Sequence, residues 1–525
     1  TSVTNKYRDS LNFLGKKGNR WITVGIIAIC SVILFGLMKV FPTGFVPQED
    51  GGVVMGTITL PPGSSLERTD SIVQIVADIT AELDAVQNTG EIKGLSVMSG
   101  VGSSYGSIII KLKDWEDRDT SANEVAAYLT EKTKSMRDAN FMFFGMPTIS
   151  GFGLSNGVEL NLQDRTGGDL YDFYNVTNEF LAKMNEREEV MTAITTFNPG
   201  FPQKQLEVDV AKVRDAGLTL SEIMGTLQAY IGSQYISNFN IYGKQFRVLV
   251  QTPPEYRSNL DALNGLFVKT PSGEMAPITG FISLTDMTGP ETLTRFNLFS
   301  SMAVTIIPNY LDGYGSGDVI QAVEEVKAEA LPNGYSYEFS GMTREEANSS
   351  SQTAMIFGLV LIFVYLLLAA LYESYIIPLA VLFSLPVGLS GVFIFLGIFG
   401  LGQGITNNIY VQISMVMLIG LLAKNGILIV EYALQRRKQG MSIVEAAVTG
   451  AVARFRPILM TSFAFILGLC PLALASGAGS IGNRSIGISA IGGMLIGTLI
   501  GLIVIPILYI LFQKLQDMMS KSDKE

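Results

Sequence analysis

The sequence contains no histidine and only two cysteines among its 525 residues. Without histidine, the chain offers no imidazole ligand for a metal ion and no imidazole to carry a proton. The cysteines, Cys30 and Cys470, both lie in apolar runs, so we expect buried thiols rather than a disulfide or a metal-binding pair. Charged residues make up only 16% of the chain, and the net charge of −10 comes without a basic arm, which argues against nucleic acid as a partner.

Apolar residues gather in six long runs, each near the ~20 residues that a helix needs to cross a bilayer. The runs cover 21–42, 353–372, 376–399, 409–434, 457–475 and 486–512. Lysine and arginine cluster before the first run, between the fourth and fifth, and after the sixth. Because basic loops of this kind face the cytoplasm, we expect a multi-pass protein whose polar segment between the first two runs lies outside the cytoplasm. The small residues of "ISAIGGMLIGTLIG" (488–501) indicate close packing between helices.

The polar segment repeats the order strand, helix, strand. Residues 53–60, 92–98, 107–112 and 140–144 have the composition of strands. Capping-box patterns, Ser64 with Glu67 and Ser121 with Glu124, predict the starts of two intervening helices. The pattern returns at 158–197 and, after an insertion, at 300–341. This order predicts two ferredoxin-like, split βαβ subdomains.

The predicted fold class is therefore an α-helical membrane bundle of six spans plus an α+β extracytoplasmic domain. The insertion between the halves of the second subdomain has strands of its own and a helix that begins at another capping box, Thr219 with Glu222. The predicted boundaries are a cytoplasmic segment 1–20, a first span 21–42, a first subdomain 43–148, a second subdomain 149–199 and 290–343, an inserted subdomain 200–289, five spans within 353–512, and a cytoplasmic tail 513–525.

A lysine interrupts the fourth apolar run, at "GLLAKNGILIVEY" (420–432). A charge at the centre of a membrane-spanning helix costs roughly 2.5–3.5 kcal/mol on insertion scales, so Lys424 is expected to face a polar interior and an anionic partner. No aspartate or glutamate occupies the central part of any other run. One interpretation of Lys424 is a static tie between helices. Glu431 and Asn425 are expected to form local hydrogen bonds.

The stretch "NFMFFGMP" (140–147) is rich in methionine and phenylalanine. Such side chains repack around ligands of different shape and are typical of adaptable apolar sites. Strand alternation sends Met142 and Phe144 to one face and Phe141 and Phe143 to the other. Ordinary core packing is the alternative interpretation of these residues.

Five long stretches carry a resemblance to a known family. They are "GFVPQEDGGVVMGTITLPPGSSLERT" (44–69), "FSGMTREE" (339–346), "AALYESYIIPLAVLFSLPVG" (369–388), "GLLAKNGILIVEYA" (420–433) and "RFRPILMTSFAFILGLCPLALASGAGS" (454–480). In their order and spacing the chain resembles the C-terminal half of a resistance-nodulation-division (RND) multidrug efflux pump of the hydrophobe/amphiphile, AcrB/MexB-like type. The resemblance covers essentially the whole chain.

The resemblance implies a secondary active transporter, not an enzyme, that exchanges drugs and other small amphiphiles for protons and needs no cofactor. It also implies a homotrimer in the inner membrane of a Gram-negative bacterium, working with a periplasmic adaptor (a membrane fusion protein) and an outer-membrane channel. The two α+β subdomains would be porter subdomains, and the insertion a docking subdomain. An N-terminal half, carrying six more spans and an aspartate pair, would precede Thr1.

The resemblance assigns a proton relay to three residues of this chain. Lys424 would neutralise a deprotonated aspartate of the N-terminal half, and Arg454 and Thr461 would belong to the same relay. Arg454 and Thr461 are seven residues apart, so they share one helix face. For Arg454 and its neighbour Arg456 the alternative interpretation is an anchor at the cytoplasmic start of the fifth span.

The resemblance also assigns substrate contacts. The residues are Met142, Phe144 and Met146 at an outer pocket, Met55, Leu95, Val97 and Ile109 at a deeper one, and Val101 and Tyr105 in the stretch "MSGVGSSYGS" (98–107), which matches a mobile loop between the pockets. That stretch is short and lacks paired phenylalanines, and Phe197 stands where the family pattern has a basic residue. These departures indicate a different preference among substrates.

Two other classes of function remain open. An RND relative could export lipids, signals or metal ions, although no histidine or cysteine lies in the external domain to bind a metal. The second class is a membrane receptor or scaffold that transports nothing, and the charge in the fourth span argues against it. No G-x-x-x-x-G-K-[ST] motif for nucleotide hydrolysis is present.

Overall fold

The computed structural model describes residues 2–16, 18–149, 151–153, 155–400 and 403–522. Thr1, Lys17 and residues 523–525 of the expected cytoplasmic ends lie outside this part of the chain. The described chain divides into two compact units, residues 1–197 with 293–525 and residues 198–292, and each is considered by itself.

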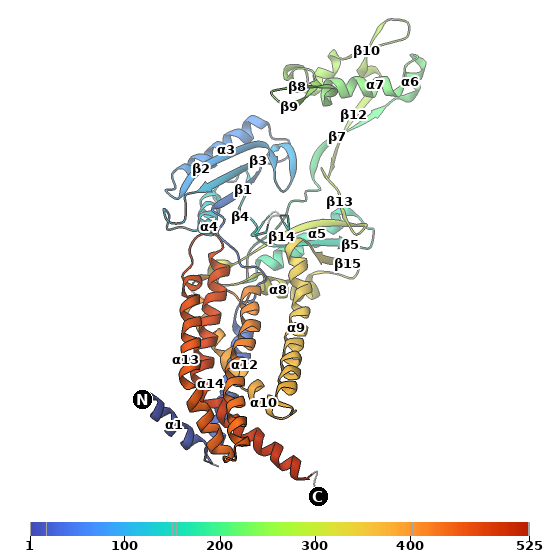
Figure 1. Ribbon diagram of the computed structural model, residues 1–525. Coiled ribbons are helices and arrows are strands. Elements are labelled where there is room, and N and C mark those ends of the chain that lie inside the picture. Colours follow the sequence, from blue (N-terminus) through green and yellow to red (C-terminus); the bar gives the residue numbers. More distant parts are fainter. Residues whose placement is uncertain (1, 17, 150, 154, 401–402, 523–525) are drawn as a thin grey trace. The chain divides into compact units, whose positions relative to one another are not determined.

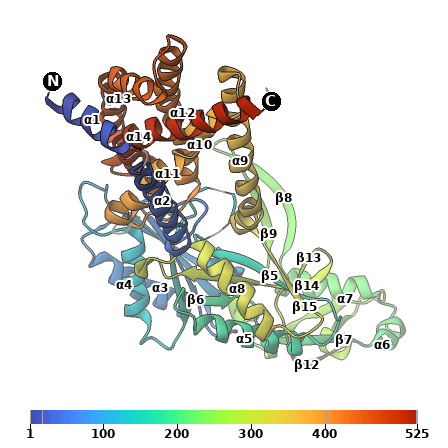
Figure 2. The ribbon, with the colours of Figure 1, turned by 90° about the horizontal axis from the view of Figure 1, so that it is seen from below.

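Helices form one part of the first unit (Figure 1). They are α1 (Ser2–Leu14), α2 (Arg20–Val40), α9 (Gly341–Tyr372), α10 (Ile377–Leu382), α11 (Leu385–Phe395) with a π-helical turn η6 (Leu396–Gly400), α12 (Ile409–Lys438), α13 (Ile443–Ala473) and α14 (Ser480–Ser522). Within the described residues, six helical segments are long and apolar enough to cross a membrane. Figure 2 shows α2 alongside α11, which it contacts.

Small residues let α11 and α14 approach closely. A Cβ atom built on Gly391 would lie 2.6 Å from the carbonyl oxygen of Gly492, and one on Gly493 would lie 2.3 Å from a methyl group of Leu418 on α12. The Gly492 carbonyl belongs to the backbone and cannot turn aside as the Leu418 side chain can, so α11 and α14 approach this closely only with glycine at position 391. The interpretation of 488–501 as a face for close helix packing is confirmed.

The start of the fifth long helix differs from the prediction. We expect it near residue 457, but α13 begins at Ile443, with Ser442 as its N-cap accepting a hydrogen bond from the backbone N–H of Glu445. Alanines between 446 and 453 favour helix, and Pro457 is accommodated inside it. Arg454 and Arg456 therefore lie in the body of α13, and their placement at a helix start is wrong.

The first sheet of the unit contains β1 (Val53–Thr59), β2 (Val86–Ser96), β3 (Gly100–Leu112) and β4 (Asn140–Gly145), in the antiparallel order β2-β3-β1-β4. Helices α3 (Leu66–Ala81) and α4 (Ala122–Thr133) supply side chains to a core with one face of this sheet. Val54, Ile58, Ile108 and Ile110 are fully buried in that core. The alternation of β4 is as predicted, because Phe143 and Phe141 join this core while Met142 and Phe144 pack elsewhere.

Two local predictions in this sheet need correction. The N-cap of α3 is Ser65, which accepts from the N–H of Arg68, whereas the Ser64 hydroxyl donates to the carbonyl of Pro61. Residues 98–107 are expected as a loop, but β3 already begins at Gly100 and pairs with β2 from Ser96. The backbone of this stretch is held further by Leu60, whose N–H donates to the carbonyl of Ser104. The capping box of Ser121 and Glu124 is confirmed.

The second sheet has the corresponding order β6-β14-β5-β15. Its strands are β5 (Val158–Asp164), β6 (Val190–Thr195), β14 (Phe299–Pro308) and β15 (Tyr335–Phe339), and the short β13 (Thr294–Phe296) pairs with the start of β14. Helices α5 (Leu170–Asn185) and α8 (Ser316–Ala330) close a core with one face. Figure 2 shows both helices on the same side of this sheet.

The second unit contains β7 (Phe201–Val208), α6 (Val210–Asp215), α7 (Leu220–Leu227) with a π-helical turn (Gln228–Gly232), β8 (Gln234–Ile241), β9 (Lys244–Val250), β10 (Phe267–Lys269), β11 (Met275–Pro277) and β12 (Ile282–Gly289). Strands β7 and β12 pair over their whole length. A separate core gathers around Val213, Ile223 and Ile278. The predicted capping box of Thr219 and Glu222 starts α7.

Candidate functional site

Lys424 lies on α12 and points out of the packed bundle. Its side chain is exposed, whereas its neighbours Ala423 and Asn425 are buried. Within the described part of the chain Lys424 forms no ion pair with a carboxylate. Glu431, expected as a local hydrogen-bond partner, accepts from Gln435 one turn further along the helix. The structure therefore leaves the charge of Lys424 without a partner in these residues.

Arg454 contacts α12 through an aromatic ring. Its guanidinium carbon lies 5.1 Å from the centre of the Tyr432 ring, and that of Arg436 lies at the same distance from the same ring. The face of an aromatic ring attracts a cation. Arg436 also donates from Nη2 to the Tyr432 hydroxyl at 2.9 Å. The buried Nε of Arg454 has no hydrogen-bond partner in the described residues.

Thr461 lies at about the level of Lys424 on the neighbouring helix. Helices α12 and α13 run antiparallel, joined by the turn at 439–442, and Tyr432 contacts Arg454 in the body of α13. Lys424 lies ~12 Å along α12 from Tyr432, and Thr461 lies ~10 Å along α13 from Arg454. The Thr461 hydroxyl donates to the carbonyl of Ile458, and its side chain is exposed like that of Lys424.

The expected substrate residues fall mainly on one face of the first sheet, opposite α3 and α4. Met55 pairs with Ile109 on one side and Phe144 on the other, so these three side chains lie in a row across β3, β1 and β4. Met55, Met142 and Phe144 are buried in a small apolar cluster, together with Ile307 of the second sheet. Val97, Met98 and Ile194 pack against this cluster.

The other expected residues are more open. Ile109 is 37% exposed beside the cluster, and Tyr105 follows on the same face of β3, opposite Thr59. Leu95 and Val101 pair at the turn between β2 and β3, and Val101 is 81% exposed. Met146 follows β4 and is 44% exposed. The structure thus brings Met55, Val97, Met142 and Phe144 together and leaves Val101 and Met146 apart from them.

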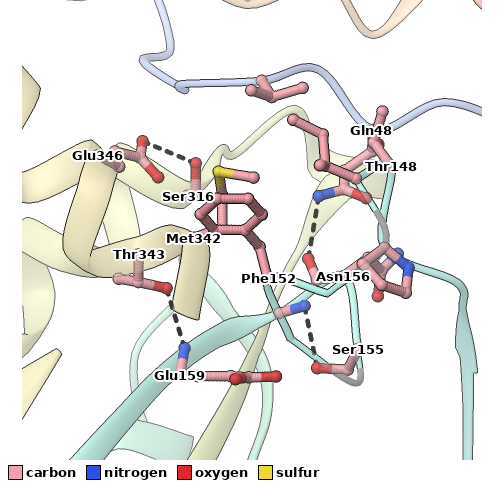
Figure 3. A pocket seen from close by; sticks show the side chains of 14 residues that line it. Gln48, Thr148, Phe152, Ser155, Asn156, Glu159, Ser316, Met342, Thr343 and Glu346 are labelled. Carbon is pink, nitrogen blue, oxygen red and sulfur yellow. Dashed lines mark hydrogen bonds between the residues drawn. The ribbon is translucent and has the colours of Figure 1, made fainter. Parts of the chain in front are cut away.

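A cavity of about 40 Å³ lies where the segment after α2, the start of β5 and the start of α9 meet (Figure 3). Gln48 donates to the carbonyl of Asn156 at 3.1 Å, and Glu346 accepts from the Ser316 hydroxyl at 2.8 Å. Phe152 also lines it. The amide oxygens of Gln48 and Asn156 are buried and lack partners within the described residues. The residues that line the cavity thus include two with amide oxygens that can accept further hydrogen bonds.

Two acidic residues in the segment after α2 accept hydrogen bonds from the first backbone N–H groups of two helices. The Glu49 carboxylate accepts from the backbone N–H groups of Ile481 and Gly482, at 3.2 and 2.7 Å, where α14 begins. A carboxylate at this end of a helix meets unpaired N–H groups and the favourable end of the helix dipole.

The neighbouring Asp50 accepts a hydrogen bond from the first backbone N–H group of α4. Its Oδ2 accepts from the N–H of Ala122 at 3.2 Å and lies 2.8 Å from Nη2 of the buried Arg118, although that N–H group is not aligned for a hydrogen bond. The Trp115 indole donates to the carbonyl of Asp50. Sequence reasoning did not assign a role to Glu49 or Asp50. Two adjacent acids directly after a membrane-length run were the available signal.

Comparison with known proteins gives consistent matches. The model of the AcrB/AcrD/AcrF family matches residues 1–513. The chain is 34% identical over 487 residues to the toluene efflux pump membrane transporter TtgB of Pseudomonas putida, covering 91% of this chain and 46% of that protein. It is 32% identical over 519 residues to the multidrug resistance protein MdtF of Escherichia coli, covering 98% and 49%. For the multidrug export protein AcrF of E. coli the identity is 32% over 518 residues, covering 97% and 49%. The chain therefore spans about half the length of the curated relatives that it matches.

Proposed function

Because this chain belongs to the AcrB/AcrD/AcrF family, we propose that it is part of a membrane transporter that exports small amphiphilic molecules in exchange for protons. The relatives' names describe a toluene efflux pump and a multidrug export protein. The six helices long enough to span a membrane provide the membrane part of such a pump. The family consists of transporters rather than enzymes.

The observation that carries the proton coupling is Lys424. It is a cation in the apolar helix α12, it faces out of the bundle, and it has no carboxylate partner within the described residues. A charge so placed in a membrane is costly unless an anion lies opposite it. We place an aspartate pair opposite it, supplied by an N-terminal half of the same pump. Protonation of an aspartate would release Lys424 and bias the packing of the helices.

Arg454 and Thr461 belong to the same proposal. Thr461 lies at about the level of Lys424, and its hydroxyl can pass on a hydrogen bond or hold a water molecule. Arg454 is held by the Tyr432 ring at the cytoplasmic end of the same helix pair. In this arrangement Arg454 connects the level of Lys424 with the cytoplasmic surface.

The substrate contacts are proposed on the apolar face of the first sheet. The methionines and phenylalanine of the buried cluster, with the half-open Ile109 at its side, provide a surface that can rearrange around different apolar shapes. The two sheets would be porter subdomains, and the second unit a docking subdomain that meets a periplasmic adaptor and an outer-membrane channel. A homotrimer in the inner membrane of a Gram-negative bacterium completes the proposal.

The test is Lys424→Ala in the intact transporter, with energised efflux of a fluorescent amphiphile from cells as the measurement. Lys438→Ala is the matched control, because Lys438 is an exposed lysine at the end of the same helix. We expect Lys424→Ala to reduce efflux to the level of cells without the pump and Lys438→Ala to leave it intact. Efflux at the unmodified rate in Lys424→Ala, at equal amounts of protein in the membrane, would contradict the coupling role.

A further inference from the structure

A second polar position lies inside the bundle, away from the face of Lys424. A cavity of about 10 Å³ lies between α12, α13, α14 and the start of α11. Its walls are mostly aliphatic, with Leu422, Ile429, Ile458, Leu502 and Ile505 among them. Three polar side chains also line it, Ser384, Asn425 and Thr498. The volume is close to the smallest space that holds one water molecule.

Asn425, which lines this cavity, has an unused hydrogen-bond donor. Its side chain is only 6% exposed, and its Nδ2 atom has no hydrogen-bond partner in the part of the chain that the structure describes. The expectation that Asn425 bonds to a local group of the protein is not met for this atom. In a membrane interior no solvent is available to satisfy a buried amide, so an unpaired donor there is costly.

An acceptor borders the same cavity. The Thr498 hydroxyl donates its single proton to the Ser462 hydroxyl at 3.0 Å, so its lone pairs remain available to accept. Thr498 is 4% and Ser462 is 1% exposed. The third polar group, the Ser384 hydroxyl, already donates to the carbonyl of Val381. A donor on α12 and an acceptor on α14 thus border one small space.

We propose that this cavity binds one water molecule, which accepts from Nδ2 of Asn425 and donates to Oγ1 of Thr498. Water both donates and accepts hydrogen bonds. It could therefore also pair with Asn425 if the amide were flipped, so that its oxygen took the place of Nδ2. The uncharged lining and the small volume argue against an ion with a hydration shell or any larger ligand. The water would join α12 to α14 at the residue next to Lys424, and this inference stands without the transport function.

Gly501 provides the test, because it lines the cavity and has room for a side chain. A Cβ atom there would meet only Cδ1 of Ile505, at an ordinary 3.6 Å. If the cavity is dry, Gly501→Ala fills a void and raises the melting temperature of the purified intact transporter in detergent. If it holds the water, the methyl group displaces that water and leaves Asn425 unpaired, and we expect a fall of about 1–3 °C. Gly501→Ser should lower the melting temperature less, because the serine hydroxyl can replace the water.

Asn425→Ala supplies the matched background. Without the amide there is no donor to leave unpaired, so Gly501→Ala should no longer lower the melting temperature. The proposal would be overturned if Gly501→Ala raised the melting temperature of the unmodified protein. It would also be overturned if Gly501→Ala lowered the melting temperature equally in the unmodified protein and in Asn425→Ala. An independent measurement needs no variant: an electron cryomicroscopy map of the intact transporter that resolves ordered water should show a peak within hydrogen-bond distance of both Asn425 and Thr498. A map of that quality without the peak would also overturn it.

Discussion

Tyr432 is the residue through which two arginines are tied to the end of α12. Arg454 and Arg436 both lie over its ring, and Arg436 also bonds to its hydroxyl. A guanidinium group is weakly hydrated and stacks well on an aromatic face. The Tyr432 ring therefore holds two like charges near each other between α12 and α13.

We expect Tyr432→Leu to destabilise the transporter by about 0.5–2 kcal/mol, the range of cation–π contacts from exposed to desolvated sites. Tyr432→Phe keeps the ring and loses only the hydrogen bond from Arg436, so it should cost less. Thermal unfolding in detergent measures both. Equal losses for the two variants would show that the hydroxyl, not the ring, is what matters.

Asp318 gives the protein a pH-dependent stability. Burial raises the pKa of its carboxyl above the ordinary 3.8, and the nearby charge of Glu189 adds to this, against hydrogen bonds from the backbone of Gly315 and Thr43. Glu346 is the other acidic group that interacts with it. The folded state then binds the proton more tightly than the unfolded state, so ionisation of Asp318 lowers stability as the pH rises from 3.8 through the raised pKa.

Asp318→Asn should remove that loss. Asparagine can still accept from the N–H of Gly315, as Asp318 does at 2.7 Å, but it carries no charge. We expect the melting temperature of the variant to equal that of the unmodified protein near pH 4 and to exceed it increasingly toward pH 7. A variant that loses stability relative to the unmodified protein as the pH rises would contradict this sign.

At the residue scale, the sequence predicted what a pattern of charge or polarity can reveal. The isolation of Lys424 followed from the absence of acidic residues in the other apolar runs, and Ser121 and Thr219 cap helices as their spacing indicated. The prediction that Ser64 caps α3 was wrong because Ser65, its neighbour, is equally suited to the role. The buried donor of Asn425 depends on which groups the other helices bring near, and a single sequence does not contain that.

Among the elements, the segment from Glu49 to Asp50 links two helices that are distant in sequence. Glu49 accepts hydrogen bonds from two N-terminal N–H groups of α14, and Asp50 accepts one from the first N–H group of α4. The segment therefore joins the membrane bundle to the first sheet through two helix ends rather than through side-chain packing alone.

We expect Glu49→Gln to weaken the start of α14 by about 0.3–1 kcal/mol, because the amide keeps an acceptor but loses the charge that favours this end of a helix. The direct measurement is faster amide hydrogen exchange at Ile481 and Gly482. Glu116→Gln is the control, since Glu116 is an exposed acid in the loop before α4. Unchanged exchange at both amides in Glu49→Gln would exclude the cap.

The elements themselves were predictable where hydrophobic periodicity was strong and their ends were marked. Strand β1 and the long apolar helices α2 and α12 fall close to their predicted ranges. The start of β3 was missed because glycine and serine between residues 99 and 107 indicate a loop locally, while pairing with β2 makes it a strand. The early start of α13 was missed because residues 443–456 include Glu445, Arg454 and Arg456 and therefore lie outside the apolar run that predicted the fifth span.

Over the whole molecule, large apolar side chains remain exposed on the helices. Trp21 and Val32 on α2, Phe363 on α9 and Leu467 on α13 are each more than half exposed. In a bilayer such surfaces contact lipid or other helices. In the proposed transporter, these surfaces and the outward-facing Lys424 are where an N-terminal half would pack.

The apolar face between the two sheets offers the clearest test of substrate contact, because neighbouring residues of β3 face opposite ways. Ile109 lies beside the cluster of Met55 and Phe144 and is 37% exposed, whereas Ile110 is fully buried against α3 and α4. We expect Ile109→Ala to change efflux of some amphiphiles while altering stability by less than about 0.5 kcal/mol. Ile110→Ala should cost about 2–5 kcal/mol of stability and reduce efflux of every substrate together, through loss of folded protein. Susceptibility of cells to a panel of amphiphiles, compared at equal amounts of transporter in the membrane, separates the two effects. If Ile109→Ala left the whole panel unchanged while remaining folded, this face of the sheet would not contact substrate at Ile109.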